Sequence, residues 1–219
     1  MTHLESFLNP ASTSLKVCGV TRREDALTLV RLGVDAIGAN FWPQSKRHIT
    51  PGEATWLHEI SNQILRVGVF VNQPADESLA LWRDGLIDVI QLHGDEGPAH
   101  HDALAAAGAP FFQAVAISPE GVPTSAIPGR AAAVLLDAHA PGVYGGTGVV
   151  IDWQAARNLR DAHPDTPVIL AGGITADNAA AAKAAVRPAA LDTASGVENA
   201  PGIKDPEKIA RLVAAIRSV

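Results

Sequence analysis

The feature that most restricts the fold is a regular alternation between short apolar segments and longer segments suited to helices. Eight apolar runs, many of them rich in β-branched residues, recur along the chain, and helix-prone stretches separate most of them. This alternation predicts parallel strands joined by helical crossovers, and near-continuous apolar strands are typical of a sheet covered on both faces. The expected strands are 15–20, 36–41, 65–71, 88–93, 111–117, 132–137, 167–172 and 189–193.

The expected helices lie between these strands, and several carry residues that begin or end helices. Pro51 after Thr50 and Pro206 after Asp205 suit a first helical position behind its N-cap. Gly33 stands where the first helix should end. The expected helices are 23–33, 51–60, 76–85, 97–108, 152–162, 175–186 and 205–216. Residues 118–129 are rich in proline and glycine and are expected to form a loop or a poor helix.

Eight strands in 219 residues favour closure into a single (β/α)8 barrel, the TIM barrel of the α/β class. An open, doubly wound sheet is the alternative, because the alternation of strands and helices does not exclude it. Residues 1–14 contain Asn9-Pro10 and a Ser/Thr cluster and are predicted to be a disordered tail. The barrel domain is expected to occupy residues 15–219.

Composition excludes several classes of function. Apolar residues make up 47% of the chain, which predicts a sizeable core, and a net charge of −6 argues against nucleic acid as the partner. The single cysteine, Cys18, cannot form an internal disulfide, which suits a reducing compartment. The chain shows neither a signal peptide pattern nor an apolar run of about 18 residues. We therefore expect a cytoplasmic protein without a membrane partner.

Two glycine-bearing turns follow the last two expected strands. Gly172 and Gly173 lie in LAGGIT, and Ser195 and Gly196 lie in TASGVE. Glycine lets the backbone approach an anion closely, and helix N-termini present free N–H groups. Turns after strands seven and eight commonly bind phosphate in this barrel, although plain tight turns are the alternative. The two turns together predict a phosphate site.

Seven motifs occur in order across residues 16–199: KVCGVT, FWPQSKRHI, GVFVNQ, QLHGDE, LLDAHAPGVYGGTG, AGGIT and ASGVEN. Together they resemble the phosphoribosylanthranilate isomerases of tryptophan biosynthesis. AGGIT also recurs in other phosphate-binding barrels, whereas KxCGxT combined with LLD and YGGTG is specific. The resemblance covers nearly the whole chain apart from its first 14 residues.

The resemblance implies an aldose–ketose isomerase that catalyses an Amadori rearrangement. The implied substrate is N-(5-phosphoribosyl)anthranilate, and the product is 1-(2-carboxyphenylamino)-1-deoxyribulose 5-phosphate. An acid opens the furanose ring, a base then removes the proton from C2, and neither a metal nor a cofactor is expected. Gly173, Ser195 and Gly196 match the family's phosphate cradle. The expected partner is this phosphorylated small molecule, bound by a monomer or a homodimer.

The same resemblance assigns roles to single residues. Cys18 corresponds to the family's general base and Asp137 to its general acid. Arg47 matches the anchor for the anthranilate carboxylate, and Asp192 matches a position near the ribose. His93, at the end of an expected strand, is predicted to line the aryl pocket. The structural alternatives are a packed core thiol for Cys18, a helix cap or loop ion pair for Asp137, and a solvated charge for Arg47.

The chain departs from the family at two places. Family members commonly carry a lysine and an aromatic residue between YGGTG and DW, where this chain has Val149, Val150 and Ile151. The usual valine and serine before SGVE are Thr193 and Ala194 here. The first change affects the glycine-rich loop 139–151, which could close over a substrate or be a passive surface loop. The second removes one hydroxyl near the phosphate and adds another beside it.

Other functions remain to be weighed against this one. Indole-glycerol-phosphate synthase needs a lysine-rich catalytic set, and the only lysine near a strand end is Lys16. A dual-substrate histidine/tryptophan isomerase is expected to use two aspartates, which Cys18 opposes. A non-catalytic phosphometabolite-binding barrel is the alternative from another class, and the pairing of Cys18 with Asp137 argues against it.

Overall fold

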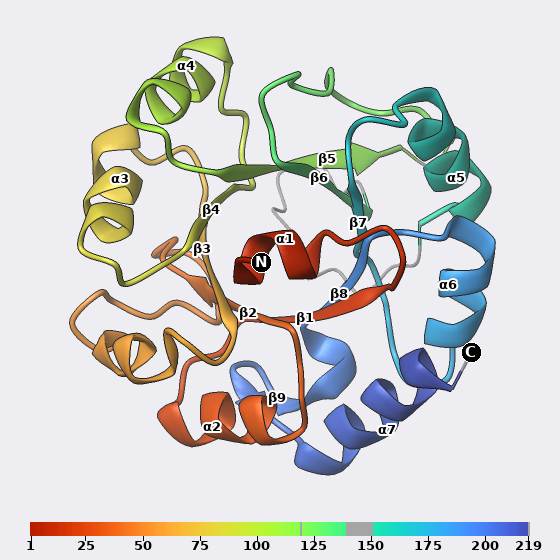
Figure 1. Cartoon of the computed structure of the whole chain (residues 1–219), viewed down its shortest axis with the longest axis horizontal. Coiled ribbons are helices and arrows are strands. Elements are labelled where there is room, and N and C mark those ends of the chain that lie inside the picture. Colours follow the sequence, from red (N-terminus) through yellow and green to blue (C-terminus); the bar gives the residue numbers. More distant parts are fainter. Residues whose placement is uncertain (119, 139–150, 219) are drawn as a thin grey trace.

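The computed structural model describes residues 1–118, 120–138 and 151–218. Its main sheet is a closed barrel in the order β1 to β8, as the sequence predicts, and Figure 1 looks down the barrel axis. Every neighbouring pair is parallel, including β1 with β8, which closes the ring. The strands are β1 Ser14–Cys18, β2 Ala36–Asn40, β3 Leu65–Phe70, β4 Val89–Leu92, β5 Phe111–Ile117, β6 Ala133–Ala138, β7 Val168–Leu170 and β8 Ala190–Thr193.

Helices surround this ring of strands (Figure 1). Most of them match the expected segments to within a few residues at either end. They are α2 Arg23–Arg31, α3 Ala75–Arg83, α4 Pro98–Ala107, α5 Trp153–Ala162, α6 Ala179–Val186 and α7 Pro206–Arg217, with 3-10 helices η1 Thr55–Ile60 and η2 Ser195–Val197.

Two connections lack an α-helix in the part of the chain that the structure describes. The segment expected as a helix over 51–60 begins with the predicted Thr50 cap, but it continues as turns and then as η1. Gly52, Thr55 and Trp56 all have weak helix propensity, which accounts for the difference. The loop expected between β5 and β6 is confirmed over residues 118 and 120–129.

Alternation along the strands sorts the apolar side chains into two layers. One layer, including Val17 and Leu136, packs between the barrel and its helices. The other, including Ala36, Leu65 and Phe112, fills the barrel itself at the amino ends of the strands. The interior towards the carboxyl ends instead receives polar side chains, which is where barrels of this kind place their sites.

The N-terminal residues differ from the expected disordered tail. They contain helix α1, His3–Phe7, which begins with a reciprocal capping box between Thr2 and Glu5. Figure 1 shows α1 lying in the opening of the barrel. Phe7 is 1% exposed and stacks on Phe112 with ring centroids 6.0 Å apart. Burial of this ring holds α1 at the end of the barrel opposite the carboxyl ends of the strands.

A small hairpin follows β8 and was not expected from the sequence. It consists of β9 Glu198–Ala200 and β10 Ile203–Lys204, which pair antiparallel. The hairpin lies outside the barrel beside α2 and α7 (Figure 1). Its inward side chains, Glu198 and Lys204, are 8% and 3% exposed. Two oppositely charged residues therefore enter the structure next to the end of β1.

Candidate active site

Cys18 is the last residue of β1, and its side chain shares a face of the strand with Lys16. Gly38 is its partner on β2, and a Cβ atom at Gly38 would lie only 2.7 Å from the Cys18 sulfur. The missing side chain on β2 thus leaves room for the thiol. Cys18 is half-buried at the carboxyl end of the barrel.

Gly19, directly after Cys18, has a φ of +70°, which L side chains rarely adopt. A Cβ atom there would also lie 2.2 Å from Cδ of Arg47. The chain therefore turns out of β1 through a glycine, and the Arg47 side chain crosses directly over it. The aliphatic part of the Arg47 side chain thus passes over the residue next to Cys18.

Burial raises the pKa of the Cys18 thiol, because a charged sulfur loses hydration inside the barrel. Positive groups oppose this effect. The charge of Lys16 lowers the pKa of Cys18, that of Asp192 raises it, and that of Lys204 lowers it. The positive groups offset the effect of burial only in part, so the pKa of Cys18 stays raised.

Lys16 is fully buried and forms an ion pair with Asp192, whose Oδ1 lies 2.9 Å from the Lys16 Nζ. Burial alone would lower the pKa of Lys16, but the charges of Asp192 and Cys18 outweigh it and raise that pKa. Lys16 is therefore a fixed cation. Asp192, expected near the ribose, is 7% exposed and holds this cation in place.

Asp137 lies near the end of β6 and is 8% exposed. Its Oδ1 accepts a hydrogen bond from the Ala138 N–H at 2.8 Å, and its Oδ2 lies 3.5 Å from Nε2 of His93. His93 Nδ1 in turn lies 2.9 Å from Nε2 of Gln91. Asp137 also interacts electrostatically with Asp192. Asp137, the expected acid, therefore lies next to His93, which was expected to line the aryl pocket. Asp137 and Asp192 also line the same pocket inside the barrel.

Arg47 is half-buried, and one edge of its guanidinium group is bound by both carboxylate oxygens of Glu198. Nε donates to Oε1 at 2.8 Å and Nη2 donates to Oε2 at 2.6 Å. Lys204 Nζ donates to the same Glu198 at 2.7 Å and to the Cys18 carbonyl oxygen at 2.5 Å. Burial acts to raise the pKa of Glu198, but the hydrogen bonds from Arg47 and Lys204 outweigh it and lower that pKa. Arg47 is thus not a solvated charge.

The four residues expected to bind phosphate are brought together. They line a small pocket of about 50 Å³ between the ends of β7 and β8. A Cβ atom at Gly196 would lie 2.1 Å from the Ile174 carbonyl oxygen, so only glycine fits there. The full lining is Asp137, Ala171, Gly172, Gly173, Ile174, Asp192, Thr193, Ala194, Ser195 and Gly196.

The hydroxyl of Thr193, one of the departures from the family pattern, does not point at this pocket as a free donor. It donates to the Ile174 carbonyl oxygen at 2.7 Å and ties β8 to the turn after β7. Asn178 supports the same turn by donating to the Gly173 carbonyl oxygen and accepting from the Thr175 N–H. The walls of the pocket are therefore fixed by side chains behind them.

The glycine-rich loop 139–150, including Val149 and Val150, lies outside the described residues. Ile151 is described and is 6% exposed within the core that packs around the barrel.

Three charged residues of this site were not found from the sequence: Lys16, Glu198 and Lys204. The signal for Lys16 was present, because only Val17 lies between it and Cys18, and alternate residues of a strand share a face. Glu198 and Lys204 come to the site through the unexpected hairpin, and no spacing in the sequence links them to β1.

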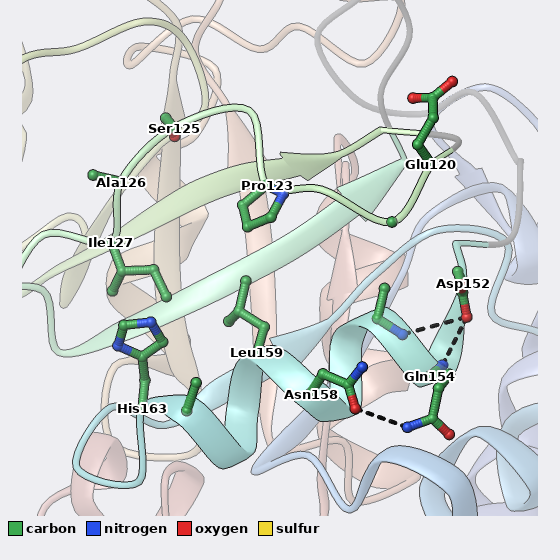
Figure 2. A pocket seen from close by; sticks show the side chains of 13 residues that line it. Glu120, Pro123, Ser125, Ala126, Ile127, Asp152, Gln154, Asn158, Leu159 and His163 are labelled. Atoms are coloured by element: carbon green, nitrogen blue, oxygen red, sulfur yellow. Dashed lines mark hydrogen bonds between the residues drawn. The ribbon is translucent and has the colours of Figure 1, made fainter.

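A second hollow lies outside the barrel, between the loop before β6 and helix α5 (Figure 2). It has a volume of about 640 Å³, and Figure 2 shows Pro123 and Ile127 facing Leu159 across it. Asp152, Gln154 and Asn158 border it but bond one another or the α5 backbone. This hollow is lined by the loop between β5 and β6 and by α5, and none of the expected site residues lies in its lining.

In the part of the chain that the structure describes, no group of three or more His, Cys, Asp or Glu side chains is arranged to hold a metal ion. Among the same residues, none of the helices has the length and apolar character needed to cross a bilayer.

The comparisons with known proteins agree with this geometry. The family model for N-(5'-phosphoribosyl)anthranilate (PRA) isomerase matches residues 15–215. The N-(5'-phosphoribosyl)anthranilate isomerase of Myxococcus xanthus is 42% identical over 213 residues, which cover 95% of this chain and 98% of the relative. The corresponding protein of Syntrophus aciditrophicus is 40% identical over 208 residues, covering 94% and 87%.

Solved structures give the same result. The crystal structure of phosphoribosyl anthranilate isomerase from Thermus thermophilus superposes with a TM-score of 0.81 at 38% identity, covering 94% of this chain and 99% of that one. A phosphoribosyl anthranilate isomerase in complex with reduced 1-(o-carboxyphenylamino)-1-deoxyribulose 5-phosphate superposes with a TM-score of 0.77 at 30% identity, covering 94% and 100%. On the matched sequence and the shared barrel, this chain belongs to the N-(5'-phosphoribosyl)anthranilate isomerase family.

Proposed function

We propose that the protein catalyses the Amadori rearrangement of N-(5-phosphoribosyl)anthranilate, the isomerase step of tryptophan biosynthesis, with Cys18 as general base and Asp137 as general acid. The observation that carries this proposal is the placement of a thiol on β1 and a carboxyl group on β6 at one end of the barrel, beside a glycine-walled pocket. This placement suits two proton transfers on a sugar whose phosphate is held at a fixed point.

The phosphate binds between the turn at Gly172-Gly173 and the turn at Ser195-Gly196. Backbone N–H groups there can approach the oxygens because Gly196 carries no side chain. The anthranilate carboxylate binds Arg47 through Nη1, because Nε and Nη2 already bond Glu198. These two anchors fix the substrate at its two anionic ends.

Protonated Asp137 transfers a proton to the furanose ring oxygen, the ring opens, and a Schiff base forms between C1 and the anthranilate nitrogen. The Cys18 thiolate then removes the proton from C2, which leaves an enolamine that tautomerises to the ketose. Cys18 ends as a thiol and Asp137 as a carboxylate, and exchange with solvent restores both groups. His93, 3.5 Å from Asp137, orients the acid and lines the aryl pocket.

The proposal includes the setting of the reaction. The partner is the phosphorylated substrate alone, without nucleic acid or membrane, and the protein acts in the cytoplasm as a monomer or a homodimer. A dimeric relative from Thermotoga maritima, of which engineered monomers have been crystallised, supports the latter possibility.

The test is a turnover assay with freshly made substrate, comparing wild type with Cys18→Ser and Asp137→Asn. Both changes are nearly isosteric and leave the fold intact, which circular dichroism should confirm. We expect wild-type turnover and a loss of about 10²-fold or more in kcat for each variant. Normal turnover in either folded variant would remove that residue from the acid–base pair, and an inactive wild type would overturn the proposed function.

A further inference from the structure

Lys16 is a buried cation that the acid–base scheme does not use. Its side chain has no exposed surface, and its Nζ lies 2.9 Å from Oδ1 of Asp192. An unpaired ammonium group buried this deeply would be strongly destabilising, so Asp192 compensates for part of that cost. The fold nevertheless retains an ion pair where an apolar pair would fill the barrel.

The location of Lys16 suggests why this ion pair is retained. Lys16 and Cys18 are alternate residues of β1 and project from the same face of the strand, so the buried ammonium group and the thiol enter the barrel side by side. A second ammonium group, that of Lys204 on β10, reaches the Cys18 carbonyl oxygen from the other side at 2.5 Å. Cys18 therefore ends β1 between two cations, each of which has its own carboxylate partner.

We propose that Lys16 is a positioning residue whose buried ammonium group favours the thiolate form of Cys18 that the isomerisation requires, while Asp192 keeps Lys16 in place. The inference rests on the proposed role of Cys18 as general base and adds that the ammonium group of Lys16 supports its thiolate form. Lys16 is not itself the base, because its ion pair with Asp192 keeps it protonated.

The physical argument compares the effects on the thiol. Burial favours the neutral thiol, which cannot accept a proton from carbon. Lys16 favours the thiolate, Asp192 opposes it more weakly, and Lys204 favours it. Arg47 also interacts with Cys18 through its charge, but Glu198 neutralises it. Lys16 is thus the strongest of the groups that offset burial.

The chain contains one cysteine, so alkylation of the intact protein reports on Cys18 alone. The experiment measures the rate of reaction with iodoacetamide against pH, by intact mass, in wild type and Lys16→Met without substrate. We expect the pH midpoint to rise by about one to three units in Lys16→Met, as the loss of a nearby charge requires. Lys16→Arg should keep the midpoint near wild type, and Lys46→Met, an exposed neighbour in sequence to Arg47, should not move it.

Asp192→Asn provides a change of opposite sign. Removal of this negative charge should lower the pH midpoint of alkylation. If the ion pair served packing alone, the midpoints of Lys16→Met and Asp192→Asn would move in the same direction or stay unchanged. If Lys16→Met does not fold, the double variant Lys16→Met with Asp192→Asn leaves no unpaired charge and should still show a raised midpoint. An unchanged midpoint in the folded Lys16 variant, or a raised one in Asp192→Asn, would overturn the proposal.

A kinetic measurement separates this inference from the proposed function. In Lys16→Met the rise of kcat with pH should move to higher pH together with the thiol midpoint. An inactive wild type would refute the function and leave the thiol titration unaffected, whereas an active enzyme with an unmoved titration would refute only the role of Lys16.

Discussion

At the scale of single residues, two glycines shape the space around Cys18. Gly38 leaves room for the sulfur, and Gly19 adopts the left-handed conformation that lets Arg47 cross above it. Neither contributes a functional group. Their role shows that the reactive environment of a thiol depends as much on absent side chains as on charged ones.

Arg47 gives a prediction at this scale. Arg47→Lys keeps the positive charge but loses the fork that can bond Glu198 and a substrate carboxylate together. We expect KM for the substrate to rise about tenfold or more, with a smaller change in kcat, as measured by steady-state kinetics. Lys46→Ala, one position away and exposed, is the matched control. An unchanged KM in Arg47→Lys would show that the substrate carboxylate binds elsewhere.

At the scale of elements, the alternation of side chains along each strand decides which residues face the interior of the barrel. Lys16 and Cys18 on β1 share the inner face, as do Gln91 and His93 at the end of β4, while Val17 packs outward against the helices. A shift of one residue in the pairing of β1 would turn Lys16 and Cys18 outward, under the helices. The register of each strand therefore decides which residues meet at the site.

Helix α1 gives the prediction for this scale. Phe7→Ala removes a ring that is 1% exposed and stacked on Phe112, so the end of the barrel opposite the site loses its cover. We expect the free energy of unfolding to fall by about 3 kcal/mol, measured by urea denaturation. Ser6→Ala, exposed on the same helix, should change it little. Equal midpoints for the two variants would mean that α1 does not stabilise the barrel.

At the scale of the whole molecule, barrel closure and the β9–β10 hairpin gather charges from distant parts of the chain. Glu198 links three of these parts, because it bonds Arg47 after β2, Lys204 on β10 and the Gly202 N–H in the turn. The sequence separation between Arg47 and Glu198 is 151 residues. Such a contact couples the integrity of the site to the stability of the entire fold.

This network predicts how stability depends on pH. The pKa of Glu198 is lower in the folded protein than its ordinary value of 4.5, so its stabilising effect is present above that pH and is lost as pH falls through the folded value. Glu198→Gln should lower the free energy of unfolding by about 3 kcal/mol at neutral pH and by less at acid pH. Urea denaturation at several pH values measures the difference.

The exposed Glu120→Gln serves as the control for that series, since its side chain lies at the surface. A gap between wild type and Glu198→Gln that stays constant with pH would show that the carboxylate charge is not what stabilises the network.

Much of the fold could be predicted from the sequence because its strands are local apolar runs. The eight strands, their parallel order and the glycine-bearing turns after β7 and β8 follow from such patterns and are found in the structure. Helix α1 was missed because five residues are too few to form a stable helix alone, and only docking of Phe7 in the barrel holds it. The hairpin was missed because its strands have three and two residues.

The sequence by itself determined the barrel, the family motifs and the residues that end its strands, since periodicity and short motifs are properties of neighbouring residues. Only the tertiary structure decided the charges around Cys18. Lys16 meets Asp192, and Arg47 meets Glu198, across 176 and 151 residues of chain. No local pattern encodes these contacts, because ion pairs in a low-dielectric interior depend on where closure of the barrel places each side chain.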